Sequence, residues 1–531
     1  MGGVFAHALA TGVFATFGSG LASAQAAYGT LPVPIGGPRA ATANAAGWHI
    51  VPEIDSELDF TDNVKLAPSD ARRSDFVLQL TPSLNINEKS AHTTLAGTIS
   101  APILLYARTG GENNDVRPQV SLAGNAELVQ KLFYVDASAQ VSQQYFSPFG
   151  ARPQSLINAT NNRYTAQSYR ISPYFKGEGA NDLHYELRDS NTWTDASGTP
   201  SATNRAYTNE ITGNVTRDPR SLGWSLDYNR THTQFHGQDT LQSQLERASA
   251  LWKPDPQLEL SASAGYEDNR YPLFSSSGVI YGGGFKWHPT NRSDVEANWE
   301  HRFFGASYHV AFNNRTPLSV WSLRASRDIT TYPQELANLA AGVDVGTLLD
   351  GLFASRVTDA AQRQAFVDQL IRDRGLPSVL SSPLALFTEQ VTLQQSLQAT
   401  VGLLGARNSI FLTAYRTRSE PVSGEAPTAA VSPIDLVALQ NDNTQTGTNV
   451  VWTYKLTPLY TLATSGDWVR TVPLRDSGLR SNQTIFRVVL SAPLSPLTTV
   501  YTGARHQRLT SDVQASYRES AIFVGIRHIF Y

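Results

Sequence analysis

Long runs of alternating apolar and polar residues dominate this sequence, and the first of them occupies residues 48–62. Its apolar face carries Trp48, Ile50, Pro52, Ile54, Ser56, Leu58 and Phe60. Its polar face carries His49, Val51, Glu53, Asp55, Glu57, Asp59 and Thr61. A period of two residues predicts a β-strand with one face in an apolar medium and the other in a wet one.

The same alternation recurs to the end of the chain and predicts about 22 antiparallel strands. Most of them run for roughly 10 to 16 residues, longer than the ~5–6 residues typical of globular sheets. Short turns such as 253–257 alternate with long polar connections such as 147–163. An even strand number, with short turns at one end and long loops at the other, is typical of outer-membrane barrels. The expected fold is therefore all-β, a single large antiparallel transmembrane β-barrel over residues 48–531.

Closure of the sheet is expected because an unpaired backbone group costs several kcal/mol in hydrocarbon. The twelve residues from Trp48 to Phe60 span roughly 40 Å along a strand, or about 30 Å of height at a tilt near 40°. This height matches the apolar band with its aromatic girdles, so both side chains are predicted interfacial anchors. Pro52 and Pro82 each remove a ladder hydrogen bond, and we expect a local bulge there.

The polar face of the first strand places Glu53, Asp55, Glu57 and Asp59 in the barrel interior. These four residues form the acidic stripe. One interpretation is a cation-attracting line of carboxylates that sets the selectivity of a pore. The other is an ordinary wet wall, neutralised by Arg and Lys on neighbouring strands.

Residues 1–24 are interpreted as a secretion signal that ends in Ala22-Ser23-Ala24, although no Lys or Arg precedes Arg39. The alternative is a weakly structured apolar tail. Residues 25–47 are rich in Pro, Gly and Ala and are predicted to be a periplasmic linker. The expected location is the outer membrane of a Gram-negative bacterium, after cleavage near Ala24.

Residues 331–388 lose the two-residue period and are predicted to form a partly helical insert in one extracellular loop. Within it, Thr358 can cap a helix that Gly375 and Pro377 end. The chain then ends on an alternating strand with a terminal aromatic residue. Such an ending resembles the signal read by the barrel assembly machinery, and its predicted residues are Ile522, Val524, Ile526, Phe530 and Tyr531.

Composition and motifs argue against several other classes of protein. The net charge of −3 gives no reason to expect nucleic acid, and the absence of Cys excludes disulfides and thiolate metal sites. No nucleotide, zinc-protease or serine-hydrolase motif is present. We therefore expect no catalytic residues, no cofactor and no metal, and predict that the chain is not an enzyme. The expected partners are outer-membrane lipid, the assembly machinery and, for transport, exopolysaccharide or exported surface proteins.

The sequence "WHIVPEIDSELDFTDNVKLAPSDARRSDFVLQLTPSLNI" resembles the outer-membrane β-barrel proteins associated with the PEP-CTERM/exosortase system of Gram-negative bacteria, which are encoded beside exopolysaccharide genes. The matching features are Trp48, Pro52, Thr61-Asp62-Asn63, Leu66-Ala67-Pro68, Ser74-Asp75 and Pro82. The match covers about 40 residues and brings no catalytic residues. The resemblance implies a role linked to exopolysaccharide, without a defined molecular activity.

Three functions are compatible with these expectations. The first is a passive channel or an export-associated barrel in which the 331–388 insert folds over or into the lumen as a constriction. Because only about 23 residues separate the signal from the first strand, no separate N-terminal plug domain is expected there. The second function is a sealed structural barrel that anchors surface polysaccharide or partner proteins. The third is a lipid-modifying barrel enzyme with Ser and His on its strand faces.

Overall fold

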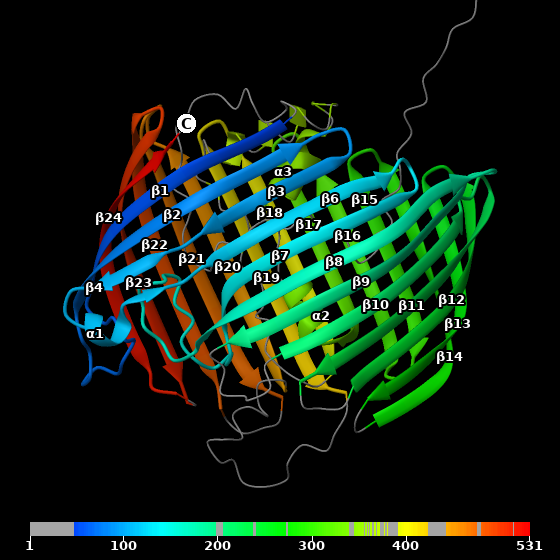
Figure 1. Ribbon diagram of the computed structural model, residues 1–531, viewed down its shortest axis with the longest axis horizontal. Helices are drawn as coiled ribbons and strands as arrows, with labels where there is room; N and C mark the ends of the chain where they lie inside the picture. Colours follow the sequence, from blue (N-terminus) through cyan, green and yellow to red (C-terminus); the bar gives the residue numbers. More distant parts are fainter. Residues whose placement is uncertain are drawn as a thin grey trace, which may run out of the picture.

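The computed structural model describes residues 47–530, except for 198–204, 237–239, 272–273, 339–344, several residues within 355–390, 423–441, 475–478 and 513. The predicted signal at 1–24 and most of the predicted linker at 25–47 lie outside the described residues, as does Tyr531. The described chain folds into a closed antiparallel β-barrel, as the sequence predicts (Figure 1).

The barrel wall contains 22 strands once two interrupted strands are counted whole. The first half comprises β1 (Gly47–Thr61), β2 (Asp75–Lys89), β3 (Thr93–Ser100), β4 (Ile103–Tyr106), β5 (Asp115–Val116), β6 (Gln119–Val129), β7 (Phe133–Tyr145), β8 (Arg163–Gly179), β9 (Leu183–Ser197), β10 (Arg205–Arg217), β11 (Leu222–Phe235) and β12 (Thr240–Asp255). The second half comprises β13 (Leu258–Tyr271), β14 (Phe274–Thr290), β15 (Ser293–Arg302), β16 (Gly305–Arg315), β17 (Ser319–Thr330), β18 (Thr392–Leu404), β19 (Asn408–Pro421), β20 (Asn443–Lys455), β21 (Thr461–Pro473), β22 (Ser481–Ser495), β23 (Thr498–Ser511) and β24 (Tyr517–Ile529). Pairing of β1 with β24 closes the ring.

The interruption between β3 and β4 lies beside Pro82, and the interruption between β5 and β6 lies beside Pro102, whose carbonyl accepts the Arg117 N–H at 2.9 Å. The register between β1 and β2 runs without a shift through Pro52 and Pro82, so the predicted bulge is wrong for this pair. On its other side β2 pairs first with β4 and then with β3, and the break includes Pro102. The Pro82 carbonyl accepts the Ala101 N–H at 3.1 Å, which shows that the missing Pro82 N–H faces this break. The Pro52 carbonyl accepts the Phe530 N–H at 2.9 Å, so its missing donor faces the end of the β24 ladder.

Short turns lie at one end of the barrel and long loops at the other, as their alternation along the sequence predicts. Turns such as 256–257 and 291–292 share one end with Gly47 and Ile529, which we call the short-turn end. Connections such as 62–74, 146–162 and 331–391 emerge at the opposite, long-loop end. In Figure 1 the short-turn end is uppermost. In outer-membrane barrels the short turns are periplasmic and the long loops extracellular.

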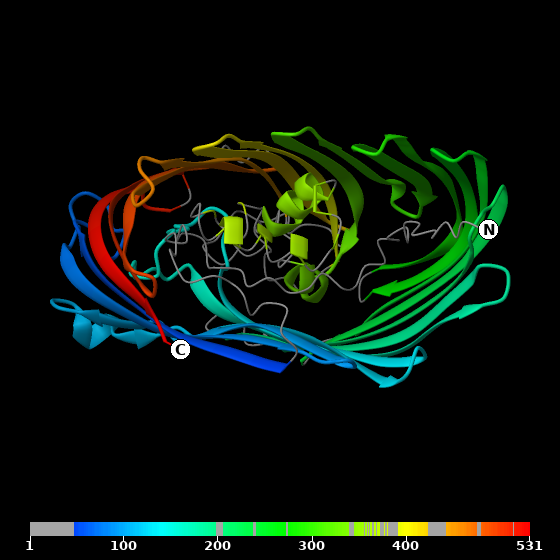
Figure 2. The same cartoon turned by 90° about the horizontal axis from the view of Figure 1, so that it is seen from above.

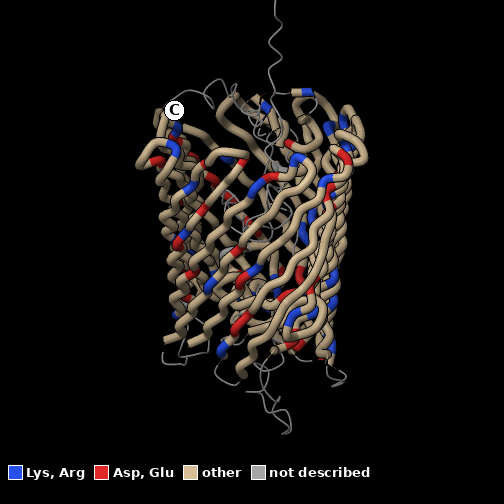
Figure 3. Tube along the Cα trace, turned by 90° about the vertical axis from the view of Figure 1, so that its right-hand side faces the viewer, with Lys and Arg blue, Asp and Glu red and all other residues tan. Residues whose placement is uncertain are grey.

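Apolar side chains cover the outer surface of the wall, as expected for strands in contact with lipid. Trp48 is 64% exposed on the outward face of β1, whereas Asp59 on the inward face is fully buried. Phe60 packs on Phe76 of β2 with ring centroids 4.9 Å apart near the long-loop end. In Figure 3 basic and acidic residues intermingle along the wall nearest the viewer, while most of each strand is uncharged.

Helices are few and short. They are α1 (Gly110–Asn113) in a loop, and α2 (Tyr332–Asn338) and α3 (Val345–Phe353) in the insert. Further helical residues include Phe366, Val367 and Leu370, but the predicted cap Thr358 and the predicted stop at Gly375 and Pro377 lie outside the described residues. None of the helices within the described parts of the chain is long and apolar enough to cross a membrane.

Candidate functional site in the barrel interior

The interior is the candidate site because two long connections fold into it. Figure 2 shows the wall as a flattened ring, with the helical segments of the 331–388 insert and the cyan 146–162 loop inside it. We call these the insert and the inner loop.

The insert packs an apolar surface against the inward face of the C-terminal strands. Leu349 of α3 and Leu376 are fully buried in this core, and Val345 joins them. The wall side of the core includes Phe411 of β19, Val451 of β20 and Phe523 of β24. Apolar residues on the inward face of a barrel strand would otherwise meet water, so the insert explains their presence at these positions.

The insert extends along the lumen from one end of the barrel towards the other. It starts at the long-loop end, directly after β17. Its α3 segment lies near the short-turn end, where the Arg315 guanidinium donates to the Gly351 carbonyl at 2.6 Å. Nearby, Arg356 donates to the carbonyl of Pro317 in the 316–318 turn at 3.0 Å. The sequence did not establish whether the insert enters the lumen, and the structure places it there.

The short helix α2 connects the insert to the opposite wall. Tyr332 packs with Tyr164 and Ala166 of β8, and the two tyrosine hydroxyls are 3.1 Å apart. On the other side Gln394 of β18 donates to the Glu335 carboxylate at 3.2 Å. Burial, followed by the neighbouring Tyr164, raises the pKa of Tyr332 well above its ordinary value. The helix therefore bridges β8 and β18 across the interior, with Tyr332 neutral at physiological pH.

The inner loop crosses from β7 and β8 to the C-terminal strands and is held there by buried polar contacts. Arg152 donates to the Thr471 hydroxyl of β21 at 2.9 Å and to the Gln445 amide oxygen of β20 at 3.4 Å. Ser481 of β22 donates to the Phe149 carbonyl at 3.0 Å, and Gln483 donates to the Arg152 carbonyl at 2.9 Å. From the sequence this segment was expected only as a long outer loop, and its entry into the lumen was missed.

The inner loop also organises itself before it meets the far wall. The Asn162 amide donates to the carbonyls of Ser147 and Ala151 at 2.9 and 3.0 Å. Arg163 donates to the carbonyls of Ser155, Leu156 and Asn158 at 3.1 to 3.2 Å. A side chain that satisfies several carbonyls of one loop limits its conformations. These Asn and Arg side chains are one local signal of an ordered loop.

The acidic stripe on β1 faces arginines of the closing strands. Arg527 of β24 forms ion pairs with Glu53 at 3.1 Å and with Asp55 at 2.8 Å. The Tyr501 hydroxyl of β23 donates to Asp55 at 2.6 Å. The half of the stripe near the short-turn end, Glu53 and Asp55, is thus paired, which is the arrangement of the neutralised-wall interpretation.

The half of the stripe towards the long-loop end, Glu57 and Asp59, lies in a buried ionic cluster. Arg505 of β23 pairs with Glu519 of β24 at 2.8 Å, and its second nitrogen lies 4.0 Å from Asp59. Thr61 and Gln507 donate to Glu519 at 2.8 and 3.0 Å. The inner loop joins this cluster, because the Asn158 amide oxygen accepts from Gln507 at 3.1 Å. Charges buried from water need such partners, since removing an ion from water costs several kcal/mol.

The charges of this wall do not balance. Glu53, Asp55, Glu57, Asp59 and Glu519 are five carboxylates, and their inward-facing basic neighbours are three arginines, Arg487, Arg505 and Arg527. Arg487 stacks over the Phe523 ring at 4.7 Å. Among these eight residues the carboxylates outnumber the arginines by two.

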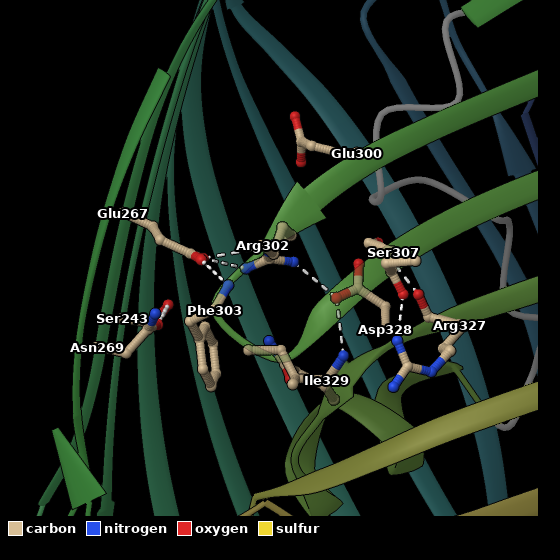
Figure 4. Close-up of polar contacts among 12 residues, drawn as sticks. Ser243, Glu267, Asn269, Glu300, Arg302, Phe303, Ser307, Arg327, Asp328 and Ile329 are labelled. Atoms are coloured by element: carbon tan, nitrogen blue, oxygen red, sulfur yellow. Dashed lines mark hydrogen bonds and ion pairs between the residues drawn. The ribbon is translucent and has the colours of Figure 1, made fainter. Parts of the chain in front are cut away.

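A second ionic network lines the opposite part of the lumen (Figure 4). Arg302 of β15 donates to Glu267 of β13 at 2.9 Å and to Asp328 of β17 at 2.6 Å. The backbone N–H of Phe303 donates to the Glu267 carboxylate at 2.8 Å, and the backbone N–H of Ile329 donates to the Asp328 carboxylate at 2.7 Å. Arg302 therefore ties three strands together where they reach the long-loop end.

The remaining predicted residues lie on the outer surface. Ile522, Val524, Ile526 and Phe530 are all between 44% and 62% exposed on one side of β24. The proposed anchors Trp48 and Phe60 are on the outward face of β1. Within the described residues, no group of three or more His, Asp or Glu side chains is arranged to hold a metal ion.

Comparison with known proteins finds likeness in fold only. No family model and no curated protein matches the sequence. The siderophore receptor PirA from Pseudomonas aeruginosa is 10% identical, with a TM-score of 0.43 over 91% of this chain and 81% of that one. The FrpB iron transporter from Neisseria meningitidis, in its F5-1 apoprotein form, is 9% identical, with a TM-score of 0.49 over 92% and 81%. A loop L8 deletion mutant of OmpT, an outer-membrane protein of Vibrio cholerae, is 9% identical, with a TM-score of 0.31 over 92% and 100%.

Proposed function

We propose that this outer-membrane β-barrel is a gated channel that serves export in a PEP-CTERM/exosortase-linked exopolysaccharide system. The observation that carries the proposal is the contact of the insert with both walls of the lumen, through Tyr164 on β8 and through the apolar core on β17–β24. A segment inside the ring that is covalently attached only at the long-loop end can move without unfolding the wall. The link to exopolysaccharide rests on the family resemblance of residues 48–86.

The inner loop supports the same proposal as a second obstruction. It approaches the β20–β24 wall from the opposite side and shares hydrogen bonds with the ionic cluster at Glu519. The surplus of carboxylates over arginines on that wall would favour cations over anions in any path between insert and wall. Partners with the matching chemistry are neutral or cationic segments of an exported chain.

The insert can be removed at a defined point of the ladder. Thr330 and Thr392 face each other in the β17–β18 register, so a two-residue Asn-Gly turn can replace residues 331–391. We expect planar-bilayer recordings of this variant to show a larger single-channel conductance than the intact barrel. An unchanged conductance would contradict the proposal.

The same design applies to the inner loop, because Tyr145 and Arg163 are paired on β7 and β8. A variant with Asn-Gly in place of 146–162 should also conduct more, and the double replacement should conduct most. The control is gel mobility: folded barrels migrate differently before and after heating, and each variant should show the same heat-dependent shift as the intact barrel, which indicates that its wall has closed.

The second candidate is a sealed barrel that anchors surface polysaccharide or partner proteins. The observation in its favour is the number of buried polar contacts that hold the inner loop, which include Arg152 to Thr471. A sealed barrel would pass no steady or voltage-triggered current when intact. A gated channel would show transitions to an open level in the same recording.

A further inference from the structure

Four arginines project from the outer surface of the C-terminal strands near the long-loop end. They are Arg416 of β19, Arg470 of β21, Arg508 of β23 and Arg518 of β24, and we call them the arginine belt. All four are exposed. Among the described parts of the chain, none has a carboxylate within 4.0 Å, whereas the neighbouring Arg418 pairs with Glu420 at 2.9 Å.

The belt borders the apolar band of the same wall on its long-loop side. Arg416 follows the outward-facing Ala414 by two residues, and Arg470 follows Trp468 by two. Arg508 and Arg518 are each four residues from Ala504 and Ile522, the last small or apolar outward positions on their strands. Two to four residues correspond to about 7–13 Å along a strand. The arginines therefore lie beyond the edge of the apolar band, where lipid headgroups replace acyl chains.

The register places these charges against one another without compensation. Arg508 and Arg518 are directly opposite in the β23–β24 ladder. Arg416 and Arg470 are both opposite Thr446 of β20, and so lie about 10 Å apart across two strand spacings. Like charges directly opposite in a sheet are destabilising, so the protein alone gives no reason for this pairing.

Nearby acidic and basic groups outside the belt are already engaged. Asp62, which follows β1, accepts the Ser520 N–H at 2.7 Å and lies 3.8 Å from Arg72. On the opposite wall, two of the outward-facing arginines carry their own carboxylates. Arg205 pairs with Asp195 at 2.8 Å, and Arg270 pairs with Asp268 at 2.9 Å. Arg230 of β11 is exposed on that wall without such a pair among the described residues, whereas four arginines of this kind gather on β19–β24.

We propose that the arginine belt binds the phosphate groups of a phosphorylated glycolipid in the outer leaflet, with the acyl chains of that lipid on the adjoining apolar band. Guanidinium groups match phosphate oxygens with paired, charge-assisted hydrogen bonds. A phosphate between Arg508 and Arg518 would replace their mutual repulsion with two attractions. The half-buried Thr446 and Asn482 sit beside the arginines and can donate to sugar or phosphate oxygens.

The test compares two paired variants with a matched control in neutral detergent. Arg416→Gln with Arg470→Gln, and Arg508→Gln with Arg518→Gln, each remove two belt charges. Arg205→Gln with Arg270→Gln removes two exposed, outward-facing arginines from the other wall. Native mass spectrometry measures binding of diphosphoryl lipid A, of phosphatidylcholine and of inorganic phosphate to each folded barrel.

We expect diphosphoryl lipid A to bind the intact barrel at least about tenfold more tightly than phosphatidylcholine, with each belt variant losing about tenfold or more. The control pair should retain the intact affinity. Equal binding of the two lipids, or an equal loss in the control, would overturn the proposal. Complete competition by millimolar inorganic phosphate would assign the belt to free anions and overturn it as well.

The unfolding midpoint is a second measurement, and the proposal predicts opposite effects on it in neutral detergent and in lipid vesicles. In neutral detergent Arg508→Gln with Arg518→Gln should leave the unfolding midpoint unchanged or raised, because repulsion is relieved. In vesicles that contain diphosphoryl lipid A the same variant should unfold at a lower midpoint than the intact barrel. A lower midpoint in both media would show that the arginines act within the protein, against the proposal.

Discussion

The hydroxyl oxygens of Tyr164 and Tyr332 lie 3.1 Å apart inside the barrel, although 168 residues separate them in the chain. One belongs to the wall strand β8 and the other begins α2 of the insert. Both side chains are at most 2% exposed, so the pair is shielded from water. It is the hydrogen bond by which the insert holds the wall opposite its own attachment.

Loss of this bond should favour release of α2. In Tyr332→Phe the Tyr164 hydroxyl stays buried without that partner, which costs about 1–3 kcal/mol. We expect the open probability in planar-bilayer recordings to rise roughly tenfold or more. Tyr308→Phe is the control, since it removes an exposed bond to Gln395 on the outer surface. Equal gating in both variants would argue that α2 carries no part of the gate.

High pH should loosen the same contact. Burial raises the pKa of Tyr332 above its ordinary value of about 10, so the docked phenol stays neutral while a released one would ionise. The stabilisation from docking is complete below pH ~10 and falls as the pH rises from there towards the folded pKa. Open probability should therefore increase above pH ~10 in the intact protein. The Tyr332→Phe variant should show a weaker pH response over the same range.

Truncation in the apolar core should displace α3. Leu349 is fully buried, so Leu349→Ala should destabilise the docked insert by about 2–5 kcal/mol. We expect more frequent openings, with heat-modifiable gel mobility unchanged because the wall is intact. Leu318→Ala, at a turn residue that is 61% exposed, should behave like the parent. A variant Leu349→Ala that gates normally would show that the core does not hold the insert.

Removal of Arg505 should weaken the barrel wall itself. Arg505→Gln leaves Glu519 and Asp59 without their guanidinium partner in a buried cluster, at a cost of about 3–5 kcal/mol. Urea unfolding in vesicles should show a lower midpoint than for the parent. Arg205→Gln removes an exposed pair and should shift the midpoint far less. Similar shifts in the two variants would contradict the assignment of Arg505 to a buried structural cluster.

Gly97 should be intolerant of any side chain. Its φ is +152°, and a Cβ there would lie 1.9 Å from the Ser121 carbonyl oxygen on β6. Gly97→Ala should therefore disturb the β3–β6 ladder and lower the yield of folded barrel. Gly466→Ala is the matched control, because a Cβ at Gly466 meets nothing within 4 Å. Folding yields are compared by gel mobility, and equal yields would mean that the ladder adapts.

The wall could be predicted from sequence because its signals are local. A two-residue alternation reveals each strand and its lipid face, and loop length reveals which end of the barrel a connection occupies. The break between β3 and β4 was missed, since Ala101-Pro102 interrupts pairing without interrupting the apolar pattern. Proline removes a donor on one edge only, so its effect depends on which neighbour that edge faces.

The interior could not be predicted in the same way because its contacts join distant parts of the chain. Arg527 neutralises Glu53 only because β24 closes on β1 in one register. Arg152 reaches Thr471 only because the inner loop turns inward. Inward-facing Phe411 and Val451 were readable in the sequence as apolar residues on a face expected to be wet. Such residues mark where the lumen is filled rather than open.

The path of the insert from Thr331 to the Pro317 turn bears on how the molecule is assembled. A ring whose seam joins its first strand to its last must close around whatever it contains. The insert precedes β18 in the chain and packs mainly on strands that follow it, so these strands can gather around it before β1 arrives. Biogenesis would then require the contents to be in position first, and a slow-folding insert would delay closure of the seam.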